Sequence, residues 1–279
     1  MKIGCHVSIA GGVENAPQRA ADFGCEVFQI FTRSPQGGKA PEITAEVAAK
    51  FKSAMDEHKM GECIVHTPYF INFGSANKRI FYGSISIIRQ ELDRASILGA
   101  AYVVTHLGSY KDLGPKKGFA QLISGLERAL IGYKGSARLL LENAAGAGEI
   151  IGDSFLELKN IIFSPKLKKY KLGICFDTAH AFASGYDIRS AAALSKVLGE
   201  FDKTVGLENL KVIHANDSKI DFAGRCDRHD HIGMGKIGLS GFRALVGNPR
   251  LQKINLYLET EHDRVKEDIK ILKKMRKVG

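Results

Sequence analysis

Cysteine is sparse in this 279-residue sequence, and its five cysteines form no Cys-x-x-Cys pair. Three of them, Cys5, Cys63 and Cys175, lie within short apolar runs that are typical of strands. An odd number of cysteines without paired spacing argues against a disulfide framework and favours buried thiols in a reducing cytosol. Cys226 precedes Asp227 and is either a bystander or a metal ligand. We favour the bystander role.

Long apolar runs are missing as well. No stretch approaches the length that crosses a bilayer, and neither end resembles a signal peptide. No linker, low-complexity segment or domain boundary interrupts the chain. The hydrophobic share of 44% and the charged share of 25% are ordinary for a globular protein. We therefore expect a cytoplasmic protein with no membrane partner, folded as one domain over residues 1–279.

Acidic residues are outnumbered by basic ones, with 30 Asp and Glu against 40 Lys and Arg and a net charge of +10. Such an excess favours polyanionic partners. Part of it is concentrated in KLKKYK (166–171) and KILKKMRK (270–277), which are typical of solvated surface and of one face of an amphipathic helix. Charge alone therefore leaves a nucleic-acid partner and a solvated basic surface equally open.

Eight short apolar runs have the length of β-strands. They occupy residues 2–5, 26–30, 63–65, 101–105, 138–141, 172–176, 210–213 and 254–258. Seven of them lead directly into an ionisable residue: His6, His66, His106, Glu142, Asp177, His214 or Glu259. The second run is the exception, because it continues into Phe31 and Thr32.

Helix-like segments alternate with these runs. They occupy residues 43–58, 80–98, 119–131, 188–198, 239–246 and 265–277. From His66 onwards the residues that close successive runs lie 35 to 45 positions apart, which is the spacing of one βα unit. Eight such units predict an α/β fold of one closed (β/α)₈ TIM barrel. The segment after Glu142 is rich in glycine and gives no clear helix.

The strand ends of a barrel face a common mouth, which is where active-site residues lie. A single histidine at a strand end is more often a hydrogen-bonded structural residue than a ligand. Six ionisable residues around one mouth are difficult to explain in that way. Unpaired carboxylates at that density would repel one another and would be costly to desolvate, whereas cations would neutralise them. The mouth is therefore predicted to hold metal ions.

Further donors lie close to these strand ends. His180 follows Asp177 by three residues, and Asp227 and His229 lie within NDSKIDFAGRCDRHDHIGMG (216–235). A solvated charged loop is the alternative interpretation of that second stretch. The full candidate set is His66, His106, Glu142, Asp177, His180, His214, Asp227, His229 and Glu259.

Nine donors exceed the three or four protein ligands of one zinc and fit two or three ions. Imidazole mixed with carboxylate suits zinc, or manganese in one position. A multi-metal cluster generates hydroxide at neutral pH and stabilises the attacking and leaving oxygens of a phosphoryl displacement. Together with the basic charge, this favours phosphodiester hydrolysis.

Several segments resemble the signatures of endonuclease IV, the zinc-dependent apurinic/apyrimidinic (AP) DNA repair endonuclease. The two most specific are GICFDTAH (173–180) and NDSKIDFAGRCDRHDHIGMG (216–235). The opening KIGCHVSIAGG also resembles that family. The remaining segments follow in the family's order and are HTPYFIN (66–72), THLGS (105–109), LENAAGAG (141–148) and LET (258–260).

The resemblance implies a TIM barrel with three zinc ions. His66 and His106 would bind the first zinc, and Glu142 would bridge it to the second. A metal-bridging hydroxide would attack the phosphate 5′ to an abasic site and leave a 3′-hydroxyl and a 5′-deoxyribose phosphate. Glu142 and Glu259 would be the catalytic residues, with Glu259 holding or orienting the nucleophile. The remaining ligands would be Asp177, His214 and Glu259 for the second zinc, and His180, Asp227 and His229 for the third.

The partner implied by the resemblance is double-stranded DNA that contains abasic sites. The protein is expected to bind it as a monomer and to be cytoplasmic and associated with DNA. Trimming of damaged 3′ ends is a further expected activity. Tyr69 and Phe70 could wedge into the duplex, although ordinary loop packing would also explain them. Arg228 is expected either to contact phosphate or to form a structural ion pair.

Two segments depart from the family. Where the family often has Arg-Gln-Trp after the second strand, this chain has Gln36, Gly37 and Gly38. Glycines supply no stacking face, so we expect this loop to hold DNA mainly by charge, through Arg33 and Lys39. The family's Gly-Glu-Gly is replaced by Gly-Met-Gly around Met234. Neither change removes a metal ligand.

Two other functions compete with this interpretation. Sugar isomerases and epimerases of the xylose-isomerase-like barrels also gather Glu, Asp and His at the mouth, but they use one or two metals. The additional His180, Asp227 and His229 argue against them. A non-catalytic DNA-damage binding protein is the third possibility, and the complete ligand set argues against that function.

Overall fold

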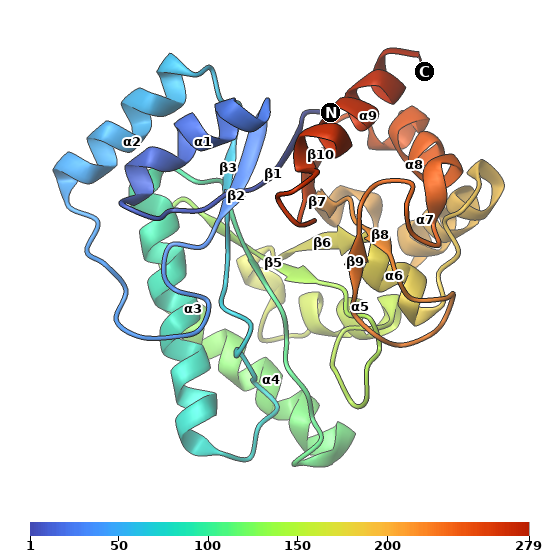
Figure 1. Ribbon diagram of the computed structural model, residues 1–279. Coiled ribbons are helices and arrows are strands. Elements are labelled where there is room, and N and C mark those ends of the chain that lie inside the picture. The colour runs from blue at the N-terminus through green and yellow to red at the C-terminus, as the bar shows by residue number, and fades with distance from the viewer. Residues whose placement is uncertain (279) are drawn as a thin grey trace.

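The computed structural model describes residues 1–278 and has eight parallel strands closed into a barrel (Figure 1). Neighbouring strands follow the order β1-β10-β7-β6-β5-β4-β3-β2, so the predicted (β/α)₈ barrel is confirmed. The strands are β1 (Ile3–His6), β2 (Val27–Ile30), β3 (Cys63–His66), β4 (Tyr102–Thr105), β5 (Arg138–Glu142), β6 (Gly173–Asp177), β7 (Leu210–His214) and β10 (Asn255–Leu258). Each of the eight predicted runs overlaps one of these strands.

Helices surround the barrel and connect its strands. They are α1 (Ala16–Phe23), α2 (Ala45–Glu57), α3 (Lys78–Leu98), α4 (Gly114–Leu130), α5 (Phe155–Ile162), α6 (Thr178–Ser184), α7 (Ala191–Thr204), α8 (Gly238–Gly247) and α9 (Val265–Val278). Short 3₁₀ turns cover Val13–Asn15, Lys168–Tyr170, Leu207–Asn209 and Pro249–Leu251. All six predicted helices are present, with ends shifted by several residues.

Three helices, α1, α5 and α6, were not predicted, and local features of the sequence explain why each was missed. Helix α1 has only eight residues, and α5 begins at the far end of the glycine-rich segment after Glu142. Ser154 caps α5 by accepting a hydrogen bond from the backbone N–H of Glu157. Helix α6 starts directly after β6, where the Asp177 carboxylate accepts the N–H of His180. Asp177 thus has two roles: it is the N-cap of α6 and a candidate metal ligand.

The barrel strands separate two apolar layers because successive side chains point to opposite faces. Outward-facing residues such as Ile3, Phe28 and Val65 pack against the helices. Seven inward-facing residues form a second layer, which we call the floor layer: Val27, Ile64, Val104, Leu140, Cys175, Val212 and Tyr257. All seven side chains are fully buried.

Two residues beyond each of the seven floor residues, towards the mouth, lies the next inward-facing position. We call these seven positions the mouth layer: Gln29, His66, His106, Glu142, Asp177, His214 and Glu259. Six of the seven were predicted as metal ligands. Positions two residues apart point to the same side of a strand, so one inward face is apolar at the floor and polar at the mouth.

Four cysteines are buried free thiols, as expected, and Cys226 is partly exposed. The Sγ atoms of Cys5 and Cys25 lie 3.5 Å apart. The N-terminus lies beside the C-terminal helix α9 (Figure 1), where Arg276 donates to the carbonyl of Met1. None of the helices within residues 1–278 combines the length and the apolar character needed to span a bilayer.

Candidate metal centre

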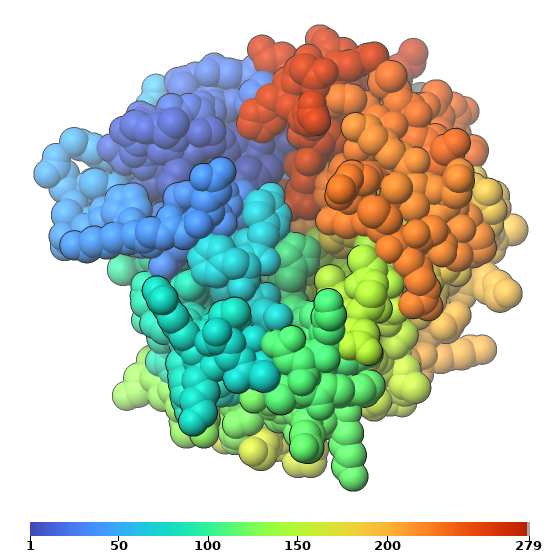
Figure 2. Space-filling view, turned by 60° about the horizontal axis from the view of Figure 1, so that its bottom comes forward, coloured from blue at the N-terminus to red at the C-terminus, as the bar shows by residue number. Residues whose placement is uncertain are grey.

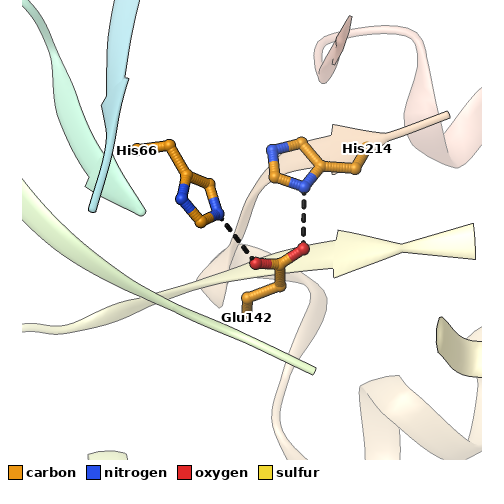
Figure 3. Close-up of side chains that lie close together, drawn as sticks. All are labelled: His66, Glu142 and His214. Carbon is orange, nitrogen blue, oxygen red and sulfur yellow. Dashed lines mark hydrogen bonds and ion pairs between the residues drawn. The ribbon is translucent and has the colours of Figure 1, made fainter. Parts of the chain in front are cut away.

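Glu142 lies at the centre of the mouth, and its carboxylate is surrounded by imidazoles. Oε2 is 3.1 Å from His66 Nε2, and Oε1 is 2.8 Å from His214 Nδ1 (Figure 3). Oε2 also lies 3.2 Å from His106 Nδ1. Burial opposes the charge of Glu142, but the neighbouring histidines, led by His106 and His214, hold its pKa well below the usual range. An ionised carboxylate with both oxygens engaged in this way can bridge two cations.

A second group forms around His214. Glu142, Asp177, His214 and Glu259 each place one donor atom within 4.8 Å of the others. His214 Nδ1 is 3.3 Å from Glu259 Oε2 and 3.9 Å from Asp177 Oδ2. Burial raises the pKa of Glu259, but the nearby histidines, led by His214, together outweigh that effect and lower the pKa to about 2. Two buried carboxylates and the partly buried Glu259 around one imidazole are well suited to a divalent cation, which would neutralise their mutual repulsion.

A third group lies between α6 and the loop after β7. His180 Nε2 and His229 Nε2 are each 3.2 Å from a carboxylate oxygen of Asp227. His229 Nε2 is buried, yet it makes no hydrogen bond to any residue that the structure describes. A buried nitrogen of this kind is normally satisfied. Its position beside Asp227 and 3.7 Å from Asp177 fits a metal ligand.

Distance alone groups some donors differently from the expected sets. His66 and Glu142 group with His214, and His180 and His229 group with Asp177. His106 nevertheless contacts Glu142, and Asp227 contacts both histidines of the third group. All nine expected donors therefore share one mouth. Their division among three ions stays a prediction.

Backbone carbonyls fix the ring orientation of two histidines. His66 Nδ1 is 2.7 Å from the carbonyl oxygen of Thr67, and His180 Nδ1 is 2.9 Å from that of Asn143. Because a carbonyl only accepts, each Nδ1 carries the proton and each Nε2 is free to bind a metal. His66 Nε2 faces Glu142, and His180 Nε2 faces Asp227.

Two asparagines close to strand ends support Asp177, and the sequence analysis missed them. The Asn143 side chain accepts from the backbone N–H of Asp177 at 2.7 Å and donates to its carbonyl at 3.1 Å. Asn216 Nδ2 donates to Asp177 Oδ2 at 2.7 Å, and Asn216 Oδ1 accepts from the N–H of Glu259 at 2.8 Å. Their position one or two residues after Glu142 and His214 was the available signal.

The loop that carries Asp227 and His229 is held by a short antiparallel ribbon of β8 (Asp217–Ser218) and β9 (His229–Asp230). The buried Asp217 carboxylate accepts backbone N–H groups of Ser218, Gly233, Ile237 and Gly238. This network fixes the loop from within. The stretch is thus an ordered loop that brings Asp227 and His229 to the mouth, while most of residues 221–228 stay exposed.

The mouth opens into a cavity of about 350 Å³. Figure 2 shows this face, on which segments from every part of the chain meet. Besides metal-ligand candidates, Tyr69, Lys219, Arg228 and Glu261 line the cavity. Lys219 and Arg228 are exposed cations beside the third group, and Lys219 was not predicted. The guanidinium of Arg228 donates to the carbonyl of Asp227, and no carboxylate ion pair to it is found within residues 1–278.

Tyr69 and Phe70 project from the rim, with 66% and 42% of their surfaces exposed. The Tyr69 ring also stacks on His106, with centroids 6.4 Å apart. Gln36 and Lys39 are exposed on the neighbouring loop, and Gly37 faces the Phe70 ring. These aromatic side chains are therefore accessible at the mouth, and their role in DNA binding stays a prediction.

The expected role of Arg33 as a phosphate contact needs correction. Arg33 is only 5% exposed, and its guanidinium is paired with the fully buried carboxylate of Glu91. Its Nη2 also donates to Gln90 at 3.0 Å. A buried carboxylate requires a partner, and Arg33 supplies it from 58 positions away. Arg33 thus anchors the loop to α3, and Lys39 is the exposed cation of the loop.

Several curated proteins resemble the chain over its whole length. The probable endonuclease 4 of Methanoculleus marisnigri is 39% identical over 278 residues, covering 99% of this chain and 98% of the relative. Residues 17–275 match the family of xylose isomerase-like TIM barrels. The chain belongs to the endonuclease IV family. The crystal structure of endonuclease IV from Thermus thermophilus superimposes with a TM-score of 0.89, at 31% identity and with full coverage of both chains.

Sugar epimerases share the architecture of the endonuclease IV fold but little of this sequence. A D-tagatose 3-epimerase-like protein superimposes with a TM-score of 0.74 at 20% identity, covering 100% of this chain and 98% of that one. Identity at this level supports a common fold alone. The barrel is therefore shared with epimerases, whereas the sequence resemblance of the whole chain is to endonuclease IV.

Proposed function

We propose that this member of the endonuclease IV family cuts double-stranded DNA at abasic sites. It hydrolyses the phosphodiester 5′ to the lesion and leaves a 3′-hydroxyl and a 5′-deoxyribose phosphate. The observation that carries the proposal is the buried Glu142 carboxylate, which faces His66 and His106 through one oxygen and His214 through the other. That arrangement suits a bridge between two metal ions.

The nine donors fit three zinc ions, with manganese suited to one position. When bound, such ions supply a water nucleophile at neutral pH and neutralise charge on the attacking and leaving oxygens of the phosphate. His229 Nε2, which is buried and makes no hydrogen bond within residues 1–278, supports a metal at the third position. The proposed ligand sets are His66, His106 and Glu142; Glu142, Asp177, His214 and Glu259; and His180, Asp227 and His229.

The protein's own side chains have separable roles in this proposal. Glu142 would hold the first two metal ions, one through each carboxylate oxygen. Glu259 is ionised, since its pKa is lowered to about 2 chiefly by His214 against the effect of burial, and it can orient a nucleophilic water. Arg228 and Lys219 at the cavity rim would contact phosphate oxygens.

The exposed aromatics would act on the DNA and not on the phosphate. An abasic nucleotide has no base to stack, so extruding it costs less than extruding a paired one. Tyr69 and Phe70 stand on the rim beside His66 and could fill the space left in the duplex. We propose that the protein does this as a monomer and that it also trims blocked 3′ ends.

A cleavage assay combined with elemental analysis tests the proposal. Zinc-loaded protein is expected to contain three metal ions per chain and to cut an abasic duplex but not the matched undamaged duplex. A parallel incubation with ketoses should give no isomer. One metal or fewer in active protein would contradict the three-ion centre, and ketose conversion without DNA cleavage would contradict the nuclease. We expect EDTA to remove the metals slowly, since several ligands hold each ion.

A further inference from the structure

Gln29 occupies the one position of the mouth layer that was not predicted as a ligand. It lies on β2, two residues beyond Val27 of the floor layer, and its side chain is fully buried. No local pattern marks this position, because the apolar run continues past Gln29 to Phe31. A buried amide in a layer of metal-ligand candidates needs partners of its own.

Three neighbours use every polar atom of the Gln29 side chain. Nε2 is 2.6 Å from Glu259 Oε1 and 3.1 Å from His6 Nδ1, and Oε1 is 2.9 Å from His214 Nε2. Because a carboxylate that serves as a metal ligand only accepts hydrogen bonds, the Gln29 atom that faces Glu259 must be the amide nitrogen. The orientation of the amide is therefore determined by its surroundings.

The amide in turn determines the tautomer of His214. Gln29 Oε1 only accepts, so His214 Nε2 must carry a proton and donate it. His214 Nδ1 then remains for a metal, and it is this nitrogen that faces Glu142 at 2.8 Å and Glu259 at 3.3 Å. Histidine ligands of metals usually donate their other ring N–H to a fixed acceptor, which orients the ring.

The same amide also orients Glu259. Gln29 Nε2 holds Oε1 of this carboxylate, which leaves Oε2 directed at His214 Nδ1. Asn216 Nδ2 lies 3.4 Å from Oε2 on the other side. One side chain therefore touches two of the four residues of the second donor group and lies outside that group itself.

We propose that Gln29 is a positioning residue of the metal centre, which fixes the metal-binding nitrogen of His214 and the direction of the Glu259 carboxylate. This inference rests on the proposed metal centre. It makes β2, which supplies none of the nine ligands, part of the same site. Partners of this kind typically change metal affinity or activity by about 10–100-fold when removed.

Gln29→Met and Gln29→Glu separate the two effects. Methionine has a similar length but neither donates nor accepts strongly, so it removes both contacts. Glutamate keeps an acceptor for His214 Nε2 but removes the donor to Glu259. Val27→Ala is the matched control, since it shortens a buried side chain on the same strand without contacting any donor. Gln29→Met at saturating zinc should lower kcat on the abasic duplex, with little change in KM.

Metal-free proteins should be titrated with zinc against a chromophoric chelator, and ¹H–¹⁵N spectra of the histidine rings should be recorded. We expect about 10–100-fold weaker binding of one ion in Gln29→Met and wild-type binding in Val27→Ala. The Nε2–H signal of His214 should persist in wild type and Gln29→Glu and be lost or shifted in Gln29→Met.

The inference is overturned if Gln29→Met binds every ion as tightly as wild type, or if its His214 signal is unchanged. These readouts need no DNA, so they distinguish this inference from the proposed nuclease function. A wild-type protein that binds three ions yet cuts no abasic duplex would overturn the function and leave the role of Gln29 to be decided by affinity and spectra. A wild-type protein that binds no zinc would overturn both. Should Gln29→Met fail to fold, the Gln29→Glu spectrum decides: loss of the Nε2–H signal there would overturn the tautomer assignment.

Discussion

The floor layer and the mouth layer of the barrel come from the same strands and lie two residues apart, yet their chemistry is opposite. The floor is apolar in six of its seven positions, and its one hydroxyl, on Tyr257, donates to Glu62. The mouth holds carboxylates and imidazoles, many of them in contact with Glu142, and one amide that contacts His214 and Glu259. Residues that stabilise this fold and residues that could bind metal therefore lie in adjacent layers of one barrel.

The two layers also differ in how completely their polar atoms are satisfied. At the floor, Glu62 receives hydrogen bonds from both Tyr257 and Asn255. At the mouth, buried carboxylates face one another, and His229 Nε2 has no hydrogen-bond partner among residues 1–278. Satisfied polar groups support a structure, whereas unsatisfied ones that converge on one region indicate a ligand. Substitutions in each layer should therefore have different consequences.

Glu142→Gln should have the largest effect on the mouth. An amide is close in shape to the carboxylate but has no charge to share between two cations, so cleavage of an abasic duplex should fall by several orders of magnitude. Stability and much of the DNA binding should persist. Single-turnover cleavage, with metal content measured on the same sample, tests this. Near-normal turnover with unchanged metal content would rule out a bridging role.

Ile64→Ala should show the opposite pattern, because Ile64 lies in the floor layer directly below His66. Removing a buried side chain of this size costs about 2–5 kcal/mol of unfolding free energy. Metal content and kcat should stay close to wild type at temperatures where the variant is folded. Urea unfolding and elemental analysis provide the two readouts. A loss of metal without a loss of stability would mean that the layers are not separable.

The sequence predicted those features of the two layers that local patterns reveal, and it missed those that depend on tertiary contacts. Local patterns sufficed for the eight strands and for most of the mouth layer, because apolar runs end visibly on ionisable residues. Gln29 was missed since the apolar residues around it hide the end of β2. Arg33 was misassigned because its partner Glu91 lies on α3, and no local pattern reveals an ion pair across 58 positions. The asparagines that support Asp177 were missed for the same reason: their contacts are tertiary.

The exposed rim extends the comparison to residues outside both layers. Tyr69→Ala should weaken binding of an abasic duplex by roughly tenfold or more, since stacking of a base on an aromatic ring is worth about 1–3 kcal/mol. Gln36→Ala should cost less, because its loop offers glycines and the exposed Lys39 instead of a ring. Affinity should also fall steeply with salt. Titrations of both variants at two salt concentrations test this, and a greater loss for Gln36→Ala would show that the loop works by contacts other than charge.

The smallest expected effect lies at the opposite end of the barrel from the mouth, where Glu26 joins α9 to β1. Its carboxylate accepts from both Nη atoms of Arg276, at 2.7 and 2.9 Å, and from the N–H of Ile3. Burial opposes the charge, but these donors outweigh it and lower the pKa of Glu26 below its usual 4.5. Ionised Glu26 therefore stabilises the fold above about pH 4.5, and this contribution is lost as pH falls through the lowered pKa.

Glu26→Gln should accordingly reduce the unfolding free energy at pH 7 by about 1 kcal/mol or less, and the difference from wild type should shrink towards zero near pH 3. Urea unfolding of metal-free proteins at both pH values measures this difference and avoids the loss of metal in acid. Glu46→Gln is the matched control, because Glu46 pairs with Lys50 on the exposed surface of α2 and should have no measurable effect. If the Glu26→Gln deficit were equally large at pH 3, the ion pair would not be its cause. Since Glu26 touches no donor of the mouth, zinc content at pH 7 should match wild type, and a change there would mean that the two ends of the barrel are coupled.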